Sequence, residues 1–214
     1  MGAIFRFVDA SIVRFTWRFS PARVLHRIRV ATCLADAREE LYFDRVDEAL
    51  DLIARFAPAT LDEIRHRFTG ILVFGTERFR LAHWNNNAKL CVITGPYLAN
   101  SAAAPEEVAM TLVHERMHAR LSGAGVSYRE GRRAPIEVIC AMAELAFARR
   151  VPNLTPLVRA CEQRIEGWSL GGEETWSNQA RRDNTLEHIR KSGVPGWLVT
   201  VLDRISRVFY RRAA

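Results

Sequence analysis

The first half of the chain contains a long stretch in which apolar residues recur at three- and four-residue steps, the spacing of an amphipathic helix. Between residues 22 and 56, charged residues separate the apolar positions Leu41, Val46, Leu50, Ile53 and Phe56. This pattern predicts a helix over 22–56, which Pro58 brings to an end. A second, short helix is predicted from about Thr60 to Phe68, because Thr60 and Glu63 have the spacing of a capping box.

After Gly70 the pattern changes to short apolar or alternating runs, which are typical of β-strands. Three such runs occur, at 71–74, 79–84 and 90–94, and a cluster of three asparagines, Asn85 to Asn87, forms a turn before the last of them. We expect the first two runs to pair and the third to join them in a small antiparallel sheet.

Helices are predicted again from residue 105 onwards. Pro105 is suited to a first helical position, acidic residues follow it, and Gly123 and Gly125 end this helix. Three more helices are expected at 135–150, 155–167 and 178–191, the last two joined by a loop at 167–174.

Together these elements predict a single α+β domain over residues 1–214 that is mainly helical. A chain of 214 residues with 49% hydrophobic composition can form a substantial core. In the expected arrangement the small antiparallel sheet packs on the helix that begins at Pro105 and on the helix after it. The centre of the domain is then residues 70–150.

Both ends of the chain are basic, whereas the body between them is nearly neutral. Residues 1–30 hold six arginines against Asp9, and residues 203–214 hold four arginines against Asp203, within a net charge of +7. Large apolar residues lie among the first arginines: Phe5, Phe7, Val8, Ile12, Val13, Phe15, Trp17 and Phe19. Such a segment either docks on the body as an amphipathic helix or lies on an anionic membrane surface, and nucleic acid is a less favoured partner.

Cysteine usage and hydropathy favour a cytoplasmic protein. The four cysteines are widely spaced and form no C-x-x-C pair, so free thiols in a reducing compartment are expected. No run approaches the ~18 consecutive apolar residues of a membrane span, and charged residues interrupt every stretch near the start that a secretory signal would need. Attachment to the periphery of a membrane through the basic ends is compatible with this location.

The segment His114-Glu115-Arg116-Met117-His118 carries the chemistry expected of this chain. Residues four apart lie on one face of a helix, so His114 and His118 can direct both imidazoles at one ion. Glu115 is adjacent to the first histidine and can reach a water on that ion, as a general base must. The segment therefore predicts a site for Zn²⁺ in which Glu115 is catalytic.

A hydrolytic zinc site needs a third protein ligand and one open position. The nearby candidates are Glu137, Glu144, Glu130 and Cys140. Glu137 is favoured, because it lies early in the following helix, where the chain has just reversed direction. Glu144 lies two turns further along nearly the same face, which suits a hydrogen bond from a histidine Nδ1–H, although it stays open as the ligand itself.

In layout, residues 105–150 resemble the zincin metallopeptidases of the glutamate-ligand type, the gluzincins, and among them the small minigluzincin and ImmA-like proteases. The resemblance rests on the two histidines, 18 intervening residues and Glu137 on a following helix, with a short sheet upstream. It implies that His114, His118 and Glu137 bind zinc and that Glu115 is the catalytic base.

Two features limit this resemblance. Leu121 and Ala124 stand where a metzincin has its glycine and third histidine, so that class is excluded. Arg116 and Arg120 occupy positions that are uncharged in peptidases of the resembled type. These charges do not prevent zinc binding, but they weaken the inference that the substrate is a polypeptide.

The sequence thus predicts a zinc-dependent hydrolase, and the resemblance makes it a metallopeptidase that acts on a peptide or protein. An extended substrate would lie along the strand at 90–94 and add itself to a free sheet edge. Tyr128 and His188 are the candidate donors to the oxyanion. The alternative is a protein that binds a membrane surface or nucleic acid through its basic termini and has a structural or vestigial metal site.

Overall fold

The computed structural model describes residues 13–34, 36–75, 81–100, 103–175, 177 and 200. The helix predicted at 178–191, the basic end at 203–214, His188 and the first twelve residues lie outside this part of the chain. The described residues form an α+β structure, as predicted, with five strands and six labelled helices after a helical segment at 13–19.

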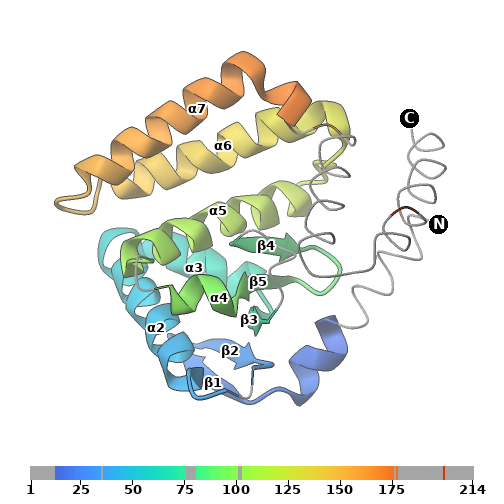
Figure 1. Ribbon diagram of the computed structural model, residues 1–214, viewed down its shortest axis with the longest axis vertical. Coiled ribbons are helices and arrows are strands. Elements are labelled where there is room, and N and C mark those ends of the chain that lie inside the picture. Colours follow the sequence, from blue (N-terminus) through green and yellow to red (C-terminus); the bar gives the residue numbers. More distant parts are fainter. Residues whose placement is uncertain are drawn as a thin grey trace.

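The strands form one mixed sheet (Figure 1). They are β1 (Ala22–Leu25), β2 (Ile28–Thr32), β3 (Gly70–Phe74), β4 (Ala82–Asn85) and β5 (Leu90–Thr94), in the spatial order β1-β2-β3-β5-β4. β2, β3 and β5 are parallel, whereas β1 and β4 are antiparallel to their neighbours. The prediction of an antiparallel sheet is therefore wrong at its centre, because a helical crossover carries the chain from β2 to β3 in the same direction. The predicted pairing of 71–74 with 79–84 is also wrong, since β4 pairs with β5.

Residues 22–38, predicted as the start of a long helix, contain the β1–β2 hairpin instead. His26 and Arg27 at its tip have φ angles of 48° and 66°. Two successive positive φ angles are those of a two-residue type I′ turn, which usually has the sequence Asn-Gly. Neither residue at this tip signals such a turn, so the apolar spacing alone suggested a helix.

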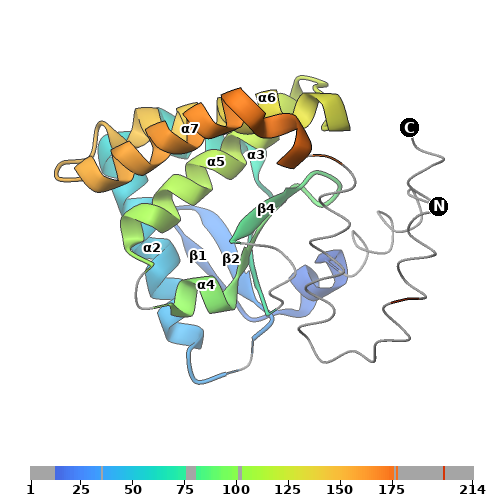
Figure 2. The same ribbon diagram turned by 45° about the horizontal axis from the view of Figure 1, so that its top comes forward.

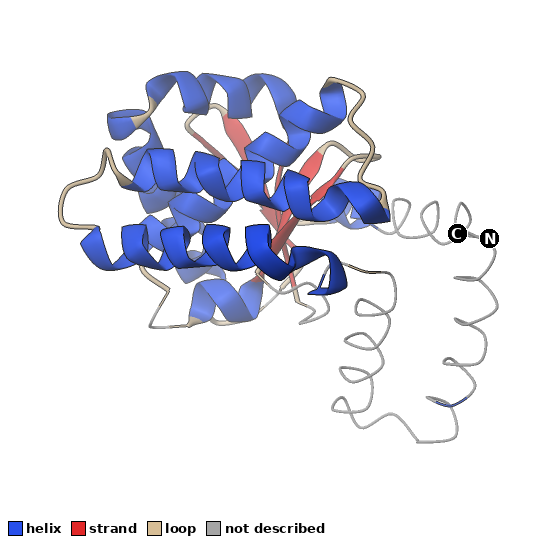
Figure 3. Cartoon of the chain, turned by 90° about the horizontal axis from the view of Figure 1, so that it is seen from above, coloured by secondary structure: helices blue, strands red, loops and turns tan. Residues whose placement is uncertain are grey.

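The helices are α2 (Glu39–Phe56), α3 (Pro58–Arg67), α4 (Gly95–Ala99), α5 (Pro105–Gly123), α6 (Glu130–Ala148) and α7 (Thr155–Thr175). α5, α6 and α7 lie one above another on the same side of the sheet (Figures 1 and 2). Seen from above, these helices cover the strands (Figure 3). None of the helices in the described ranges has the length and apolarity needed to cross a membrane.

The bounds of α5 are those predicted, but three other helix predictions are corrected. α6 begins at Glu130 rather than Pro135, which places Glu137 in its second turn. Pro135 is tolerated inside the helix because a proline this near the start removes only one backbone hydrogen bond. α7 continues through the expected loop at 167–174, although Gly167, Gly171 and Gly172 each cost about 1 kcal/mol in a helix. α3 begins at Pro58, so Thr60 lies inside the helix and no side chain caps its start.

The sheet is buried on both faces at its centre, which explains the continuous apolar run in β5. Ile71, Cys91 and Ile93 belong to the large core shared with the helices. On the opposite face, Leu72 and Val92 form a smaller cluster with Val13, from the helical segment at 13–19. The helices therefore pack on one face of the sheet, and the helical segment at 13–19 packs on its other face.

Acid is expected to destabilise the protein in part through His83 on β4. Burial lowers the pKa of the His83 imidazole to about 4. The unfolded chain takes up a proton near pH 6.5 and the folded chain does not, so this group removes stability as the pH falls from 6.5 towards 4. With a chelator present, the unaltered chain should lose up to about 3 kcal/mol more of its unfolding free energy between pH 7 and pH 4 than His83→Gln does.

Urea unfolding at several pH values measures this difference. His66→Gln removes an exposed imidazole on α3 and is the matched control. Equal acid sensitivity of His83→Gln and the unaltered chain would contradict the prediction.

Candidate metal centre

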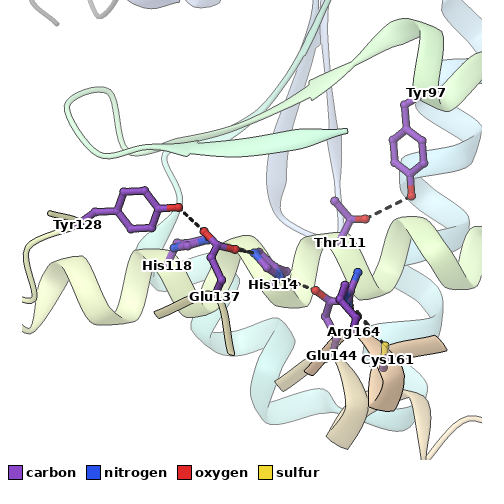
Figure 4. A network of polar contacts seen from close by, with 9 residues as sticks. All are labelled: Tyr97, Thr111, His114, His118, Tyr128, Glu137, Glu144, Cys161 and Arg164. Carbon is purple, nitrogen blue, oxygen red and sulfur yellow. Dashed lines mark hydrogen bonds and ion pairs between the residues drawn. The ribbon is translucent and has the colours of Figure 1, made fainter. Parts of the chain in front are cut away.

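His114 and His118 lie one turn apart on α5 and direct their imidazoles at the same point (Figure 4). Their Nε2 atoms are 3.0 Å apart. Both side chains are largely buried, with 13% and 15% of their surface exposed. The predicted convergence of the two imidazoles is confirmed, and the helical repeat accounts for it.

Glu137 reaches the two imidazoles from α6. Its Oε2 lies 3.1 Å from His114 Nε2, and its Oε1 lies 3.4 Å from His118 Nε2. In a tetrahedral zinc site with bonds of about 2.0–2.1 Å to nitrogen and oxygen, neighbouring ligand atoms are about 3.3 Å apart. Two histidines and one glutamate at this spacing fit a zinc ion in both chemistry and geometry.

Glu144 and Arg164 lie on the other side of His114 (Figure 4). The Nδ1–H of His114 donates to Glu144 Oε1, which is the contact predicted from the position of Glu144 on α6. Arg164, on α7, donates to the other oxygen of Glu144. With its Nδ1 proton held in this way, His114 directs Nε2 at the point that it shares with His118.

The protonation of these groups is coupled. Burial alone lowers the pKa of the His114 imidazole, but its hydrogen bonds to Glu137 and Glu144 raise it to about 10. Burial raises the pKa of the Glu137 carboxyl, yet its hydrogen bonds with His114 and His118 hold it well below the usual range. A proton on His114 thus provides the positive charge between the carboxylates of Glu137 and Glu144, and a metal ion bound at this point would have to displace it.

Glu115 is buried, with 5% of its surface exposed. The backbone N–H of Trp84, on β4, donates to its carboxylate, whereas Oε2 has no hydrogen-bond partner among the described residues. Burial raises the pKa of this carboxyl, although the imidazoles of His114 and His118 lower it in part. A buried carboxylate oxygen without a partner is costly, and this one lies beside two convergent histidines, which keeps Glu115 as the candidate base.

Cys140 is a further donor within reach of the histidines. It lies on α6 one turn after Glu137, and it is fully buried. Its Sγ and the ring nitrogens of His114 and His118 lie within 4.8 Å of one another, so these three side chains can also hold an ion. Burial raises the pKa of the thiol well above its usual range, and the nearby carboxylates raise it further. We favour Glu137 as the third ligand, since its contacts are shorter and it is already ionised.

Tyr128 enters the site from the loop between α5 and α6. Its hydroxyl donates to Glu137 Oε1, and its ring stands edge-on to His118 with 5.6 Å between ring centroids. Tyr128 therefore belongs to the constellation, while its role as an oxyanion donor stays a prediction. Glu130, another ligand candidate, is exposed at the start of α6.

A pocket of about 470 Å³ adjoins this network and shares Glu144 with it. Leu81, Met110 and Leu157 supply apolar walls, while Tyr97 and Arg164 supply polar ones. Its walls come from α4, α5, α6, α7 and the residue that precedes β4, so only the folded chain creates it.

Two contributions to the site were missed in the sequence. Arg164 follows Leu157 and Cys161 at helical spacing on α7, and this stripe was the one available signal that it faces α6. The backbone N–H of Trp84 carries no sequence signal, because any residue except proline supplies the same donor.

Loss of either Glu144 or Arg164 is expected to weaken zinc binding. Partners that orient a metal-ligating histidine typically contribute about 10–100-fold to metal affinity. Glu144→Gln and Arg164→Gln should each raise the dissociation constant for zinc by a factor in this range, as measured by competition with a chromophoric chelator. Arg149→Gln, which removes a surface ion pair with Glu162, is the matched control and should leave the affinity unchanged.

No protein-family model, no curated protein and no solved structure matches the chain. The gluzincin resemblance therefore stays a prediction that rests on residues 105–150.

Proposed function

We propose that the chain is a zinc-dependent hydrolase and that its substrates are peptides or proteins. One observation carries the proposal: the Nε2 atoms of His114 and His118 and the carboxylate of Glu137 converge within 3.4 Å of one another. Beside them, Glu115 Oε2 is buried without a partner among the described residues. Three ligands next to a carboxylate that is not needed as a ligand favour a hydrolytic site.

The net charge of the donor set also matches that of a divalent cation. Arg164 neutralises Glu144, which leaves the carboxylates of Glu115 and Glu137 to balance two positive charges. A zinc ion held there would supply a Lewis acid that polarises a carbonyl oxygen and makes water acidic enough to ionise near neutral pH.

Glu115 performs the proton transfers in this proposal. Its Oε2 accepts a proton from the attacking water as the new C–O bond forms, and returns it to the leaving nitrogen as the amide C–N bond breaks. The products are a carboxylic acid and an amine. The raised pKa of the Glu115 carboxyl helps it to hold this proton between the two steps, and the N–H of Trp84 keeps the side chain oriented.

Tyr128 is the donor that we assign to the developing oxyanion. Its hydroxyl already lies at Glu137, and its ring is held edge-on against His118. A donor that is held in place before the reaction stabilises developing charge without the cost of reorganisation.

The substrate strand differs from the one that the sequence suggested. β5 has β3 on one side and β4 on the other, so no peptide can add to it. β4 is the last strand of the described sheet. The carbonyl of Leu81 accepts from Thr94 on β5, so by strand alternation the backbone groups of Ala82 and Trp84 point away from β5. We propose that an extended peptide adds to this edge, where the Trp84 N–H already meets Glu115.

The pocket next to Glu144 is the place that we assign to a substrate side chain. Leu81, which directly precedes β4, and Glu144, which contacts His114, both line it. A peptide along β4 would therefore pass from the metal centre to this pocket.

The purified protein tests the proposal directly. It should contain one zinc per chain by elemental analysis and should cleave members of a peptide mixture, as detected by mass spectrometry. Chelation should abolish cleavage and added zinc should restore it. Absence of a bound metal, or cleavage that survives chelation, would contradict the proposal.

The third ligand is tested by a pair of variants on one face of α6. Loss of a partner that only orients a ligand is expected to reduce zinc affinity about 10–100-fold. Glu137→Gln should reduce it further, because this substitution removes a charged ligand. Cys140→Ala should keep the affinity within a few-fold. The same chelator competition measures both, and the reverse result would make Cys140 the ligand.

A second candidate function follows from the position of Cys140. If His114, His118, Glu137 and Cys140 all bound one ion, the site would be closed and structural. Substitution of cobalt for zinc distinguishes the two, because a thiolate ligand adds a charge-transfer band that Cys140→Ala would abolish. The hydrolase proposal expects no such band. A cytoplasmic location stays a prediction under either function.

A further inference from the structure

The helical segment at 13–19 covers the face of the sheet opposite to α5, α6 and α7 (Figures 1 and 2). Val13 is buried against the sheet, and Trp17 packs beside it under the guanidinium of Arg29, 4.6 Å from the ring centroid. Arg29 also donates to the Trp17 carbonyl at 3.0 Å. These contacts anchor one side of the segment and thereby determine which side faces outward.

The outward side carries two phenylalanines. Phe15 is 68% exposed and Phe19 is 67% exposed, and their ring centroids are 4.7 Å apart. Val24 on β1, at the edge of the same sheet face, is 73% exposed. Side chains with this much apolar surface in water are usually scattered singly, whereas these two rings form one continuous apolar projection.

The part of the chain that carries this projection is rich in arginine. The described residues 13–34 contain Arg14, Arg18, Arg23, Arg27 and Arg29, and no aspartate or glutamate. Within the described chain only Arg23 of these forms an ion pair with a carboxylate, that of Glu40, and the exposed guanidinium of Arg14 donates to the Asn87 carbonyl. Helical spacing places Arg14 and Arg18 on one flank of the pair formed by Phe15 and Phe19.

We propose that Phe15 and Phe19, flanked by Arg14 and Arg18, attach the protein to an anionic lipid bilayer. The two rings enter the boundary between headgroups and acyl chains, and the arginines bind lipid phosphates. A bilayer fits better than nucleic acid, because the rings pack against each other and do not form separate stacking platforms for bases. The buried contacts of Val13 and Trp17 keep the body of the protein on one side of the membrane.

Flotation of the full chain with phosphatidylcholine vesicles, with and without phosphatidylglycerol, tests this inference. The unaltered chain should float only with the anionic vesicles, and less so at high salt. Phe15→Ser/Phe19→Ser should reduce partitioning about tenfold or more, since two apolar rings no longer leave water. Arg14→Gln/Arg18→Gln should weaken it as well and should remove most of the salt dependence.

Met142→Ser is the matched control, because Met142 is an exposed apolar residue (56%) on α6. It should float like the unaltered chain. Failure of the unaltered chain to float, or equal flotation of the phenylalanine variant, would overturn the inference. So would binding of duplex DNA that is stronger than vesicle binding, or a dimer that the phenylalanine substitutions convert to a monomer without any flotation. The arginine variant keeps the test decisive if the phenylalanine variant does not fold.

Discussion

Replacement of Glu115 by glutamine is expected to abolish turnover and to leave one zinc bound per chain. A positioned general base typically accelerates a reaction about 10²–10⁴-fold, and the amide cannot accept the proton. The amide oxygen can still accept the Trp84 N–H, so the side chain should keep its place. The turnover number with a cleaved peptide and the zinc content of the same preparation measure the two effects.

The control for this variant lies on the same helix. Glu106→Gln removes a carboxylate from the first turn of α5 and should leave turnover unchanged. Folding should not confound the result, because burial already disfavours the ionised form of Glu115 and a neutral amide tolerates the same site. A Glu115→Gln protein that keeps a tenth or more of the turnover would refute the assigned role.

His114→Ala is expected to lose bound zinc, turnover and a large part of the stability. His114 is the centre of the network, because it contacts His118, Glu137 and Glu144. Its removal leaves two buried carboxylates with fewer partners, and breaking a buried ion pair in this way costs about 3–5 kcal/mol. The stabilisation of the folded chain by bound zinc is lost in addition. It amounts to about 2.7 kcal/mol when the free zinc concentration is 100 times the dissociation constant.

Thermal unfolding with and without zinc separates these two losses. Zinc should raise the melting temperature of the unaltered chain and should have no effect on His114→Ala. His118→Ala should also lose zinc, but with a smaller loss in the metal-free state, because His118 makes no contact with Glu144. His66→Ala, on the exposed side of α3, should respond to zinc like the unaltered chain. Zinc binding by His114→Ala at unchanged affinity would rule out the proposed site.

The parts of the fold that were predictable are those with local causes. The bounds of α5 follow from a proline at its first position and from glycines at its end, and the described Gly125 indeed has a positive φ of 79°. The β1–β2 hairpin was not predictable, because the positive φ angles of His26 and Arg27 are uncommon for these residue types. Strand order was not predictable either, since it depends on which strands meet after α2 and α3 return the chain.

The candidate site also contains parts that have local causes and parts that depend on packing. The convergence of His114 and His118 needs only the helical repeat, so five consecutive residues were enough to predict it. The choice between Glu137 and Cys140 depends on how α6 packs against α5, and both residues face the histidines. Arg164 comes from a third helix, and the Trp84 N–H comes from the edge of the sheet.

Spacing along one helix is set by covalent geometry and backbone hydrogen bonds, which are the same in every α-helix. Contacts between helices depend on the whole set of side chains packed between them, and these are separated by loops that impose no direction. For this reason the amino-acid order was sufficient for two candidate ligands and one candidate base. Glu137 was also favoured from the sequence as the third ligand, but its distance from the histidines, the groups that orient His114 and the place of β4 at the edge of the described sheet depend on packing between distant segments.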